Sequence, residues 1–466
     1  MVEVKAQQIE TVVSGLTDEV LTKLAIKKRG EATELLVQSI ERNQKIYTTR
    51  DDNKTEMWIY QEGIYVPQGK SFIREYIRNI LGQAYTGHIC NEVIGKIEAD
   101  TFINSEDFFI NEFIEEIPLE NGILNIINEK LTSFTPSKIF FNKLPVTYSP
   151  DSECPNIDKH LREVLKSEDD IKVLYEIIGF CLYKEYFLEK CIMFVGDGRN
   201  GKGKTIDLIR RFLGLSNCSS VPLSSLNDDS FRVSELFGKM VNLAGDLSNT
   251  SLKETGMLKQ TTGRDLIGAK RKFLNDINFI NYSKHIFACN DLPKVYDMSK
   301  GFWERWMVFE FPYTFIPKTE YDSLKATERE NTKIMDTDLI NKISSPEELS
   351  GLLNKALEGL QRILKNKEFS YSTGSDEIKK MWIRKADSFV SFCYDNIVED
   401  NEGSITKANI RKAFFNYCKQ HSLKGVSDRS MAITLQEMYG VIDTRLPDTQ
   451  RTSVWNGIKL KTDWKI

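Results

Sequence analysis

A run of glycine, asparagine and basic residues at 196–205, GDGRNGKGKT, has the composition of a loop that binds phosphate. Glycines allow backbone N–H groups to approach an anion closely, and a lysine side chain can reach the β- and γ-phosphate oxygens of a nucleoside triphosphate. The pattern G-x-x-x-x-G-K fits this run in two registers, one ending at Lys202 and the other at Lys204. The chemistry that these residues indicate is nucleotide binding and phosphoryl transfer to water.

The register that ends at Lys202 is favoured, because its first residue, Gly196, directly follows an apolar run and a phosphate loop starts where its strand ends. This register places Gly203 where a Mg²⁺-binding hydroxyl is expected, so Thr205 or a water molecule would have to supply that ligand. The register that ends at Lys204 has Thr205 in the expected place but starts beyond the end of the strand. The predicted nucleotide-binding residues are Gly196, Asp197, Gly198, Arg199, Asn200, Gly201, Lys202, Gly203, Lys204 and Thr205.

Three further polar residues are placed to act on a bound nucleotide. Asp246 follows the apolar run 240–244 and is a candidate for holding Mg²⁺, directly or through water. Asn290 follows the run 285–289, and its amide would bond the attacking water or the γ-phosphate. Arg305 lies between two tryptophans, where it is either stacked on the rings or a finger that reaches a neighbouring subunit's nucleotide. The predicted catalytic residues are therefore Lys202, Asp246, Asn290 and Arg305.

A basic cluster lies between the second and third of these apolar runs. Lys270, Arg271 and Lys272 follow a Thr-Gly turn within the segment 259–273. They would suit the tip of a hairpin that contacts phosphates, and a solvated basic loop is the alternative.

The elements that must position these residues follow from the spacing of apolar side chains. Short apolar runs at 191–195, 240–244, 285–289 and just before Phe311 predict buried parallel strands. Helical spacing over 205–213, ended by a glycine, predicts that a helix follows the glycine-rich loop. Further helices are predicted over most of 1–50, at 71–81, at 89–98 and over 157–190, and a hairpin at 58–65.

Composition excludes several classes of protein. The 466 residues are too many for one core, and 41% hydrophobic and 28% charged residues are ordinary for a globular protein. A net charge of −4 argues against a protein that coats nucleic acid, so any such contact must be local. The 8 cysteines are scattered without C-x-x-C pairs, which indicates a reducing compartment, and no apolar run is long enough to span a membrane. We expect a cytoplasmic protein, in the host cytoplasm if a virus or plasmid encodes it.

The ordered set of motifs resembles a known family. GDGRNGKG at 196–203, the strand before Asp246, the K-x-x-T-G-x-D segment at 259–265, Asn290 and Arg305 together resemble the superfamily 3 helicases, in the phage, plasmid and poxvirus primase-helicase branch. NGIL at 121–124, LPVTYSPDSECP at 144–155 and ALEGLQRIL at 356–364 resemble the segments that flank the motor in that family.

The resemblance implies roles for individual residues. Lys202 and its loop would bind the triphosphate, Asp246 would be the Walker B acid and Asn290 the sensor. Arg305 would be a finger supplied in trans, and Lys272, with Lys270 and Arg271 beside it, would contact DNA inside a ring. Gly203 departs from the family's usual Ser or Thr, which leaves the Mg²⁺ ligand open. Some relatives carry a second acid beside the Walker B residue, which this sequence lacks. Nor do the roughly 100 residues ahead of the motor contain the Asp-x-Asp cluster of a primer-making polymerase domain.

The C-terminal part indicates a DNA role independently of the motor. Residues 378–466 hold fifteen Lys and Arg against ten Asp and Glu, so a locally basic module belongs to an acidic protein. Predicted helices at 386–396, 406–421 and 428–438 precede a β-rich end, which is the order of a winged helix. The helix 428–438 would be the recognition helix, and the predicted DNA contacts on or near the wing are Arg445, Arg451 and Lys459. A winged helix used only for protein contacts is the alternative.

The predicted fold class is an α/β P-loop AAA+-like ATPase core with a helical N-terminal region and a C-terminal winged-helix domain. The predicted division is an N-terminal α+β region at 1–156, a helical lead-in at 157–189, the ATPase core at 190–320, a helical linker at 321–377 and the winged helix at 378–466.

The predicted function is an ATP- and Mg²⁺-dependent ring helicase, a hexamer that translocates on single-stranded DNA in replication of a virus, plasmid or other mobile element. A separate primase or polymerase is an expected partner. Two alternatives stay open. One is an initiator that binds duplex origin DNA and uses ATP for assembly. The other is a P-loop ATPase that acts on protein partners.

Overall fold

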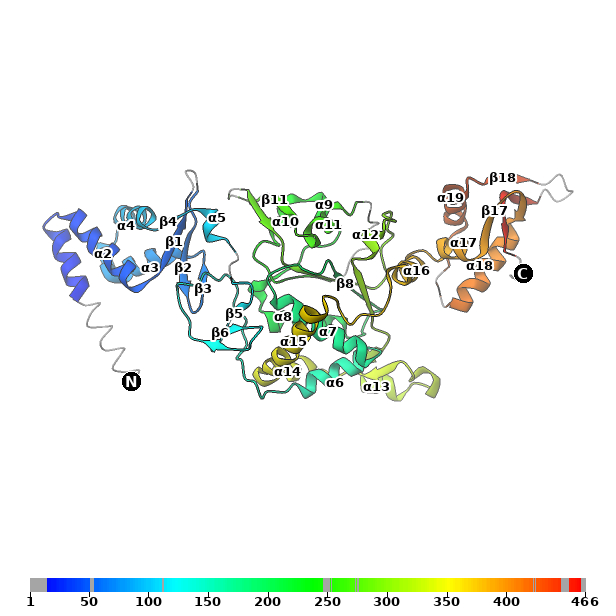
Figure 1. Ribbon diagram of the computed structural model, residues 1–466, viewed down its shortest axis with the longest axis horizontal. Helices are drawn as coiled ribbons and strands as arrows, with labels where there is room; N and C mark the ends of the chain where they lie inside the picture. The colour runs from blue at the N-terminus through cyan, green and yellow to red at the C-terminus, as the bar shows by residue number, and fades with distance from the viewer. Residues whose placement is uncertain are drawn as a thin grey trace.

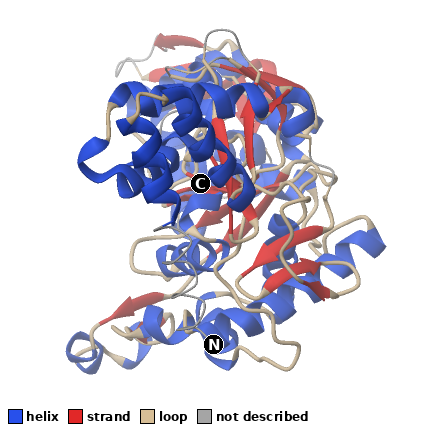
Figure 2. Ribbon diagram, turned by 90° about the vertical axis from the view of Figure 1, so that its left-hand side faces the viewer, coloured by secondary structure: helices blue, strands red, loops and turns tan. Residues whose placement is uncertain are grey.

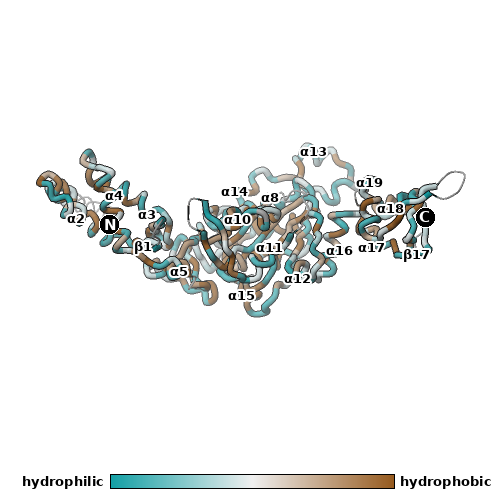
Figure 3. Tube along the Cα trace, turned by 90° about the horizontal axis from the view of Figure 1, so that it is seen from above, coloured by the Kyte–Doolittle hydropathy of each residue, from teal (hydrophilic) through white to brown (hydrophobic). Residues whose placement is uncertain are grey.

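The computed structural model describes residues 15–50, 54–110, 113–245, 252, 254–272, 274, 276–421, 423, 425–445 and 452–461. Figure 1 shows an elongated chain with an N-terminal, a central and a C-terminal body in a row. Each body has hydrophobic core clusters of its own. The tube in Figure 3 shows the same row from above. No helix among the described residues is long and apolar enough to cross a membrane.

The N-terminal body packs helices on a small sheet, and its helices lie nearest the viewer in Figure 2. The predicted hairpin at 58–65 is confirmed, because two antiparallel strands meet at Glu62 and Gly63, both with positive φ. The strand order is β3-β2-β1-β4. The elements are a helical stretch at 15–25, α2 (Arg29–Asn43), β1 (Ile46–Thr49), β2 (Met57–Gln61), β3 (Ile64–Val66), α3 (Gly69–Leu81), α4 (Gly87–Asp100) and β4 (Phe102–Ile103).

The central body is built on a five-stranded parallel sheet with the order β14-β8-β13-β10-β9. Four of its strands confirm the predicted apolar runs. Because the strands are parallel, the residues that follow each of them meet at one edge of the sheet. The strands are β8 (Cys191–Val195), β9 (Cys218–Ser219), β10 (Val241–Ala244), β13 (Lys284–Cys289) and β14 (Trp306–Glu310).

Helices cover both faces of this sheet, because alternate side chains of each strand enter different cores. Ile192 and Phe194 pack in one core with α6 (Pro155–Val164), α7 (Glu168–Leu182), α8 (Lys202–Leu213), α14 (Leu339–Ile343) and α15 (Pro346–Asn366). Met193 and Val195 pack in the other core with α9 (Ser225–Asp228), α10 (Ser230–Ser234), α11 (Gly256–Thr262), α12 (Lys300–Trp303) and α16 (Ser375–Ala386).

Smaller elements surround this sandwich. A two-stranded antiparallel hairpin holds the predicted basic tip between its strands. An antiparallel sheet of β5, β6 and β7 adds apolar residues to the core that contains α7. These elements are α5 (Ser105–Phe108), β5 (Glu116–Leu119), β6 (Gly122–Asn125), β7 (Leu131–Thr132), β11 (Leu266–Ala269), β12 (Ile277–Ile280), β15 (Thr314–Ile316), α13 (Lys318–Asp322) and β16 (Thr332–Ile334).

The C-terminal body combines three helices with an antiparallel sheet of order β17-β19-β18. All three predicted helices are confirmed. The first strand, between the first and second helices, was not predicted from the sequence. The elements are α17 (Ser388–Asn396), β17 (Ile397–Thr406), α18 (Lys407–His421), α19 (Asp428–Tyr439), β18 (Ile442–Arg445) and β19 (Ser453–Leu460).

The packing groups the chain differently from the predicted division at three boundaries. The expected linker at 321–377 contains α15, which packs on α7 in the main core and so belongs to the central body. The boundary at 378 falls inside α16, whose Trp382 is buried among the tryptophans of the central body. The separate core of the C-terminal body begins at Phe389. The segment from β5 onward also joins the central core instead of the N-terminal one.

Candidate phosphate-loop site

The glycine-rich loop lies at the carboxyl edge of the parallel sheet, between β8 and α8. Gly201 caps α8 in the left-handed region with φ +91°, which favours glycine. A Cβ on Gly196 would lie 2.5 Å from the carbonyl oxygen of Phe311, so only glycine fits against the end of β14. The first N–H groups of a helix have no partner within it and carry its positive dipole end. The local geometry is therefore that of an anion-binding loop.

Lys202 is the lysine that the fold brings into this loop. It is buried, with 7% of the residue exposed, and its Nζ lies 3.1 Å from Asn290 Oδ1 and 3.3 Å from the carbonyl oxygen of Asp197. Nζ also donates to the carbonyl oxygen of Gly196. Lys204, the lysine of the other register, is exposed on α8. This placement favours the register from Gly196 to Lys202.

Asn290 joins the site because β13 lies beside β8 in the sheet. It directly follows β13, and Cys289 pairs with Val195 at the same edge. Its contact with Lys202 places an amide next to the lysine that would hold the terminal phosphates. Asp246, the predicted Mg²⁺ ligand and Walker B acid, lies outside the described residues.

The prediction that Thr205 binds Mg²⁺ does not agree with its placement. Thr205 is fully buried, and its hydroxyl donates to the carbonyl oxygen of Gly201 at 3.2 Å and lies 3.2 Å from His160 Nε2. Burial lowers the pKa of His160 to about 4, so the ring is neutral near pH 7. Thr205 therefore anchors α8 to α6. A Cβ on Gly203 would meet nothing within 4 Å, so this position has room for the water that was the other expected ligand.

Two lysines and a glutamate that sequence analysis missed lie beside the loop. Glu310 ends β14, next to Val195, and its carboxylate contacts Lys166 and Lys385. Burial raises the pKa of Glu310, but the hydrogen bonds from the lysines together outweigh it, so the pKa lies below its ordinary value. A pocket of about 170 Å³ lies here, lined by Gly196, Asp197, Asn200, Glu310, Tyr313 and Lys385. The sequence feature that could have indicated Glu310 is its position as an acidic residue at the end of a predicted strand.

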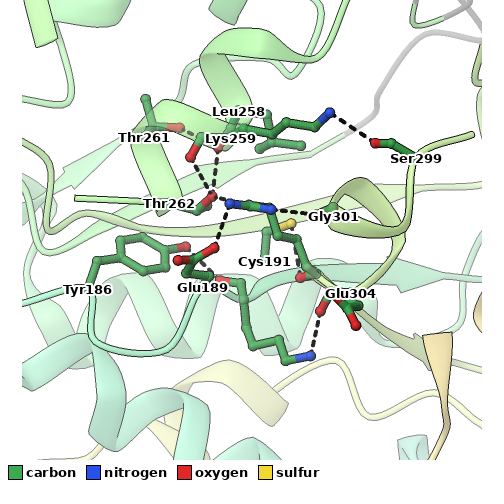
Figure 4. A network of polar contacts seen from close by, with 12 residues as sticks. Tyr186, Glu189, Cys191, Leu258, Lys259, Thr261, Thr262, Ser299, Gly301 and Glu304 are labelled. Atoms are coloured by element: carbon green, nitrogen blue, oxygen red, sulfur yellow. Dashed lines mark hydrogen bonds and ion pairs between the residues drawn. The ribbon is translucent and has the colours of Figure 1, made fainter. Parts of the chain in front are cut away.

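Arg305 is held within its own chain, at the opposite end of β14 from the loop. Its Nε donates to Thr262 Oγ1 at 2.9 Å, one terminal nitrogen lies 2.5 Å from Glu189 Oε2, and the other donates to the carbonyl oxygen of Gly301. Figure 4 shows three residues of this network, Glu189, Thr262 and Gly301. The side chain of Arg305 is 15% exposed. Hydrogen bonds to oxygen atoms therefore fix the guanidinium of Arg305, and not stacking on the neighbouring tryptophan rings.

A buried lysine positions the loop that carries Glu189. Lys284, the first residue of β13, is fully buried and donates to the carbonyl oxygens of Tyr183 and Glu185, just beyond the end of α7. Burial lowers its pKa to about 7. The segment between α7 and β8 is thereby fixed to the sheet, and Glu189 with it.

The predicted DNA contacts are divided between hairpin and C-terminal body. Lys270 and Lys272 are exposed at the hairpin tip, but Arg271 forms a two-pronged ion pair with Glu56 of the N-terminal body, with N–O distances of 3.0 and 3.4 Å. Lys459 on β19 pairs with Asp400 at 2.7 Å. Arg445 is exposed at the end of β18, and the predicted contact Arg451 lies outside the described residues.

The residues that are present fit a triphosphate better than they fit a metal alone. The loop, the helix N-terminus and Lys202 Nζ together present donors and positive charge. Among the described residues no three His, Cys, Asp or Glu side chains gather into a metal site. Mg²⁺ commonly binds through one or two carboxylates together with phosphate oxygens and waters, and the candidate carboxylate, Asp246, lies outside the described residues.

Comparison with known proteins gives partial matches. Residues 8–166 match a family described as D5 N terminal like, and residues 194–305 match a family of unknown function, DUF5906. The second match spans the phosphate loop, Asn290 and Arg305. A protein of Acanthamoeba polyphaga mimivirus with the name "Putative helicase" is 26% identical over 176 residues. Those residues are 36% of this chain and 18% of that protein.

Solved structures of the apo NrS-1 C-terminal region are also similar to this chain. Two of them share 14% and 15% of residues, and each comparison covers 91% of this chain and 98% of the other. The TM-scores are 0.44 and 0.43.

Proposed function

We propose that the chain is an ATP-dependent DNA helicase that acts in replication of a virus or another mobile element. The observation that carries the proposal is the contact of Lys202 with Asn290 inside a glycine-rich loop at the edge of a parallel sheet. The helicase name of the mimivirus relative and the D5-like match support it. In finer terms, we propose an AAA+-like motor of the superfamily 3 type with a C-terminal winged helix.

The residues in the loop would perform distinct tasks in hydrolysis. Lys202 would exchange its carbonyl partners for β- and γ-phosphate oxygens, because an anion attracts its charge more strongly than neutral carbonyls do. Asn290, beside it, would orient the attacking water or bond the γ-phosphate. Bound Mg²⁺ would neutralise charge that develops on the phosphate oxygens. Asp246 and a water in the space next to Gly203 would hold the metal.

Arg305 would complete the site of a neighbouring copy. A finger of this kind contributes about 10³- to 10⁵-fold in rate. Because Glu189 and Thr262 hold the guanidinium in the single chain, a neighbour's phosphate would have to compete with the Glu189 carboxylate. Hydrolysis would therefore depend on assembly into a ring, proposed to be a hexamer, with the hairpin tips directed at the DNA strand.

The experiment that tests the function measures ATP hydrolysis and strand displacement by the purified chain, each with and without single-stranded DNA. A helicase hydrolyses ATP faster with DNA and separates a forked duplex only with ATP and Mg²⁺. Hydrolysis that ignores DNA and yields no strand separation would indicate a motor for protein partners. Sequence-specific duplex binding without strand separation would indicate an initiator.

A further inference from the structure

We propose that the exposed face of α18 in the C-terminal body binds single-stranded DNA, with a base stacked on Phe415 and phosphates bound by Lys412 and Lys419. The inference rests on the proposed function for the choice of DNA as the ligand. It assigns a binding surface to a helix that the order of elements in a winged helix would not select, because that order selects α19 as the recognition helix.

The first observation that supports this surface is the difference in charge between α18 and α19. α18 contains Lys407, Arg411, Lys412, Lys419 and His421 and no acidic residue. α19 contains one arginine, Arg429, against Asp428 and Glu437. Phosphate attracts basic side chains, and binding of the strand backbone is dominated by such contacts. The polyanion therefore fits α18 better than α19.

The second observation is the arrangement of side chains on α18. Lys412, Phe415 and Lys419 are spaced three and four residues apart, so they lie on one face of the helix. All three are exposed, while Ala413, Phe414 and Tyr417 pack into the core on the other side. Neither lysine forms an ion pair with any other described residue. Both charges on this face are thus available to a ligand.

The third observation is the exposure of Phe415. The residue is 69% exposed, an unusual position for a phenylalanine, and it stands between the two lysines. An exposed ring flanked by cations matches the recurring platform for single strands, in which bases stack on aromatic side chains and cations follow the backbone. A duplex has its bases already stacked inside, so this ring would gain little from duplex DNA.

A groove beside Phe415 gives room for an unstacked base. Its volume is about 590 Å³. Phe414, Cys418, Leu423 and Met431 line it with apolar surface, and Arg411 and Lys419 also belong to its lining. Arg411 is bound to Asp428 at the start of α19, with Nε 2.8 Å from the carboxylate. Arg411 therefore helps hold α18 to α19, and the proposal does not depend on it.

The test uses the full chain and a fluorescein-labelled oligothymidylate, with binding followed by anisotropy over a range of salt. Phe415→Ala and Phe415→Leu should each weaken binding about tenfold, because both remove the stacking ring, while Phe415→Trp should retain it. Lys412→Ala with Lys419→Ala should reduce the slope of log affinity against log salt by about 1.4, about 0.7 per lost contact. Arg429→Ala, an exposed cation on α19, is the matched control and should leave binding within about twofold.

A position-specific readout separates this surface from other DNA contacts of the chain. An oligothymidylate with bromodeoxyuridine should crosslink to the peptide that contains Phe415. Wild-type affinity in the Phe415 and lysine variants, or crosslinks found only elsewhere, would overturn the proposal. A loss of binding in Arg429→Ala but not in the α18 variants would assign the surface to α19. Because DNA-free hydrolysis does not involve α18, absence of hydrolysis with crosslinks still at Phe415 would defeat the proposed function alone.

Discussion

At the residue scale, the choice between two lysines decides how the loop works. Lys202 is buried against Gly196, Asp197 and Asn290, whereas Lys204 is exposed. We expect Lys202→Ala to abolish ATP hydrolysis and Lys204→Ala to retain most of it, measured as phosphate release at saturating ATP. Circular dichroism serves as the folding control. The opposite result would assign the phosphate contact to the register that ends at Lys204.

The buried pair of His160 and Thr205 makes stability depend on pH. The pKa of His160 is about 4 in the folded chain, below its ordinary value near 6.5, because burial disfavours the charged ring. The unfolded chain therefore takes up a proton first as pH falls. The contribution to stability is complete above about pH 6.5 and is lost between about pH 6.5 and 4. The loss amounts to about 3 kcal/mol.

Urea unfolding at pH 7 and pH 5 measures this dependence. In His160→Gln the drop in unfolding free energy between the two pH values should be smaller than in the wild type. His88→Gln, at an exposed histidine, is the control and should keep the wild-type drop. An equal drop in all three proteins would show that His160 does not titrate as a buried group.

At the element scale, two helices of the central body approach so closely that glycine is required between them. A Cβ on Gly179 in α7 would lie 2.1 Å from the carbonyl oxygen of Ala356 in α15. We expect Gly179→Ala to destabilise the chain by about 1–3 kcal/mol, because backbone would have to move. Gly95, inside α4, has nothing within 4 Å of a Cβ, so Gly95→Ala should stabilise by about 0.5–1 kcal/mol. Calorimetric unfolding would measure the stability change of both variants. Changes of the same sign in Gly179→Ala and Gly95→Ala would contradict the packing described here.

The elements were largely predictable from sequence because their apolar side chains follow simple periods. Runs such as Cys191–Val195 are buried on both faces and stand out as continuous apolar stretches. The partners of these elements were not predictable. That α15 packs on α7 and α16 on the central tryptophans depends on contacts between segments far apart in the chain. For this reason α15 and α16 pack in the central body, which the predicted boundaries at 321 and 378 did not anticipate. A helical segment within 321–377 was expected, whereas the helix α16 was not.

In the candidate site, too, the residues at strand ends were predictable from the sequence, whereas their long-range contacts were not. Lys202 and Asn290 were predictable because each follows an apolar run, and parallel strands bring their ends together. The ion pairs of Arg305 with Glu189 and of Glu310 with Lys385 were not, because nothing local in the sequence marks a partner so far along the chain. The burial of Thr205 was equally hidden, since it depends on α6 covering that side of α8.

At the scale of the whole molecule, the position of Arg305 far from its own loop predicts cooperation between copies. Arg305→Ala should remove hydrolysis, and so should Lys202→Ala. Mixing the two inactive proteins should restore part of the activity, because some interfaces then pair an intact loop with an intact arginine. Hydrolysis across a titration of the two variants measures the recovery. No recovery, in mixtures shown by mass spectrometry to contain both chains, would contradict a finger that acts between subunits.

The N-terminal body restrains the hairpin that is proposed to contact DNA. Glu56 binds Arg271 with both carboxylate oxygens, and the two side chains are only 16% and 17% exposed. A phosphate that bound Arg271 would have to displace this carboxylate, so the N-terminal body would compete with the proposed DNA strand for the hairpin. We therefore expect Glu56→Gln to bind single-stranded DNA about threefold more tightly at moderate salt. Arg271→Ala should bind more weakly.

Charge alone has to be separated from this competition. Glu75→Gln removes one negative charge at an exposed site on α3 of the same body and is the matched control. Long-range repulsion would act on both variants alike, whereas a competing carboxylate acts only at position 56. The double variant Glu56→Gln with Arg271→Ala should lose the gain, because Glu56 then has no arginine to release. If the double variant still binds DNA more tightly than the wild type, Glu56 does not act through its ion pair with Arg271.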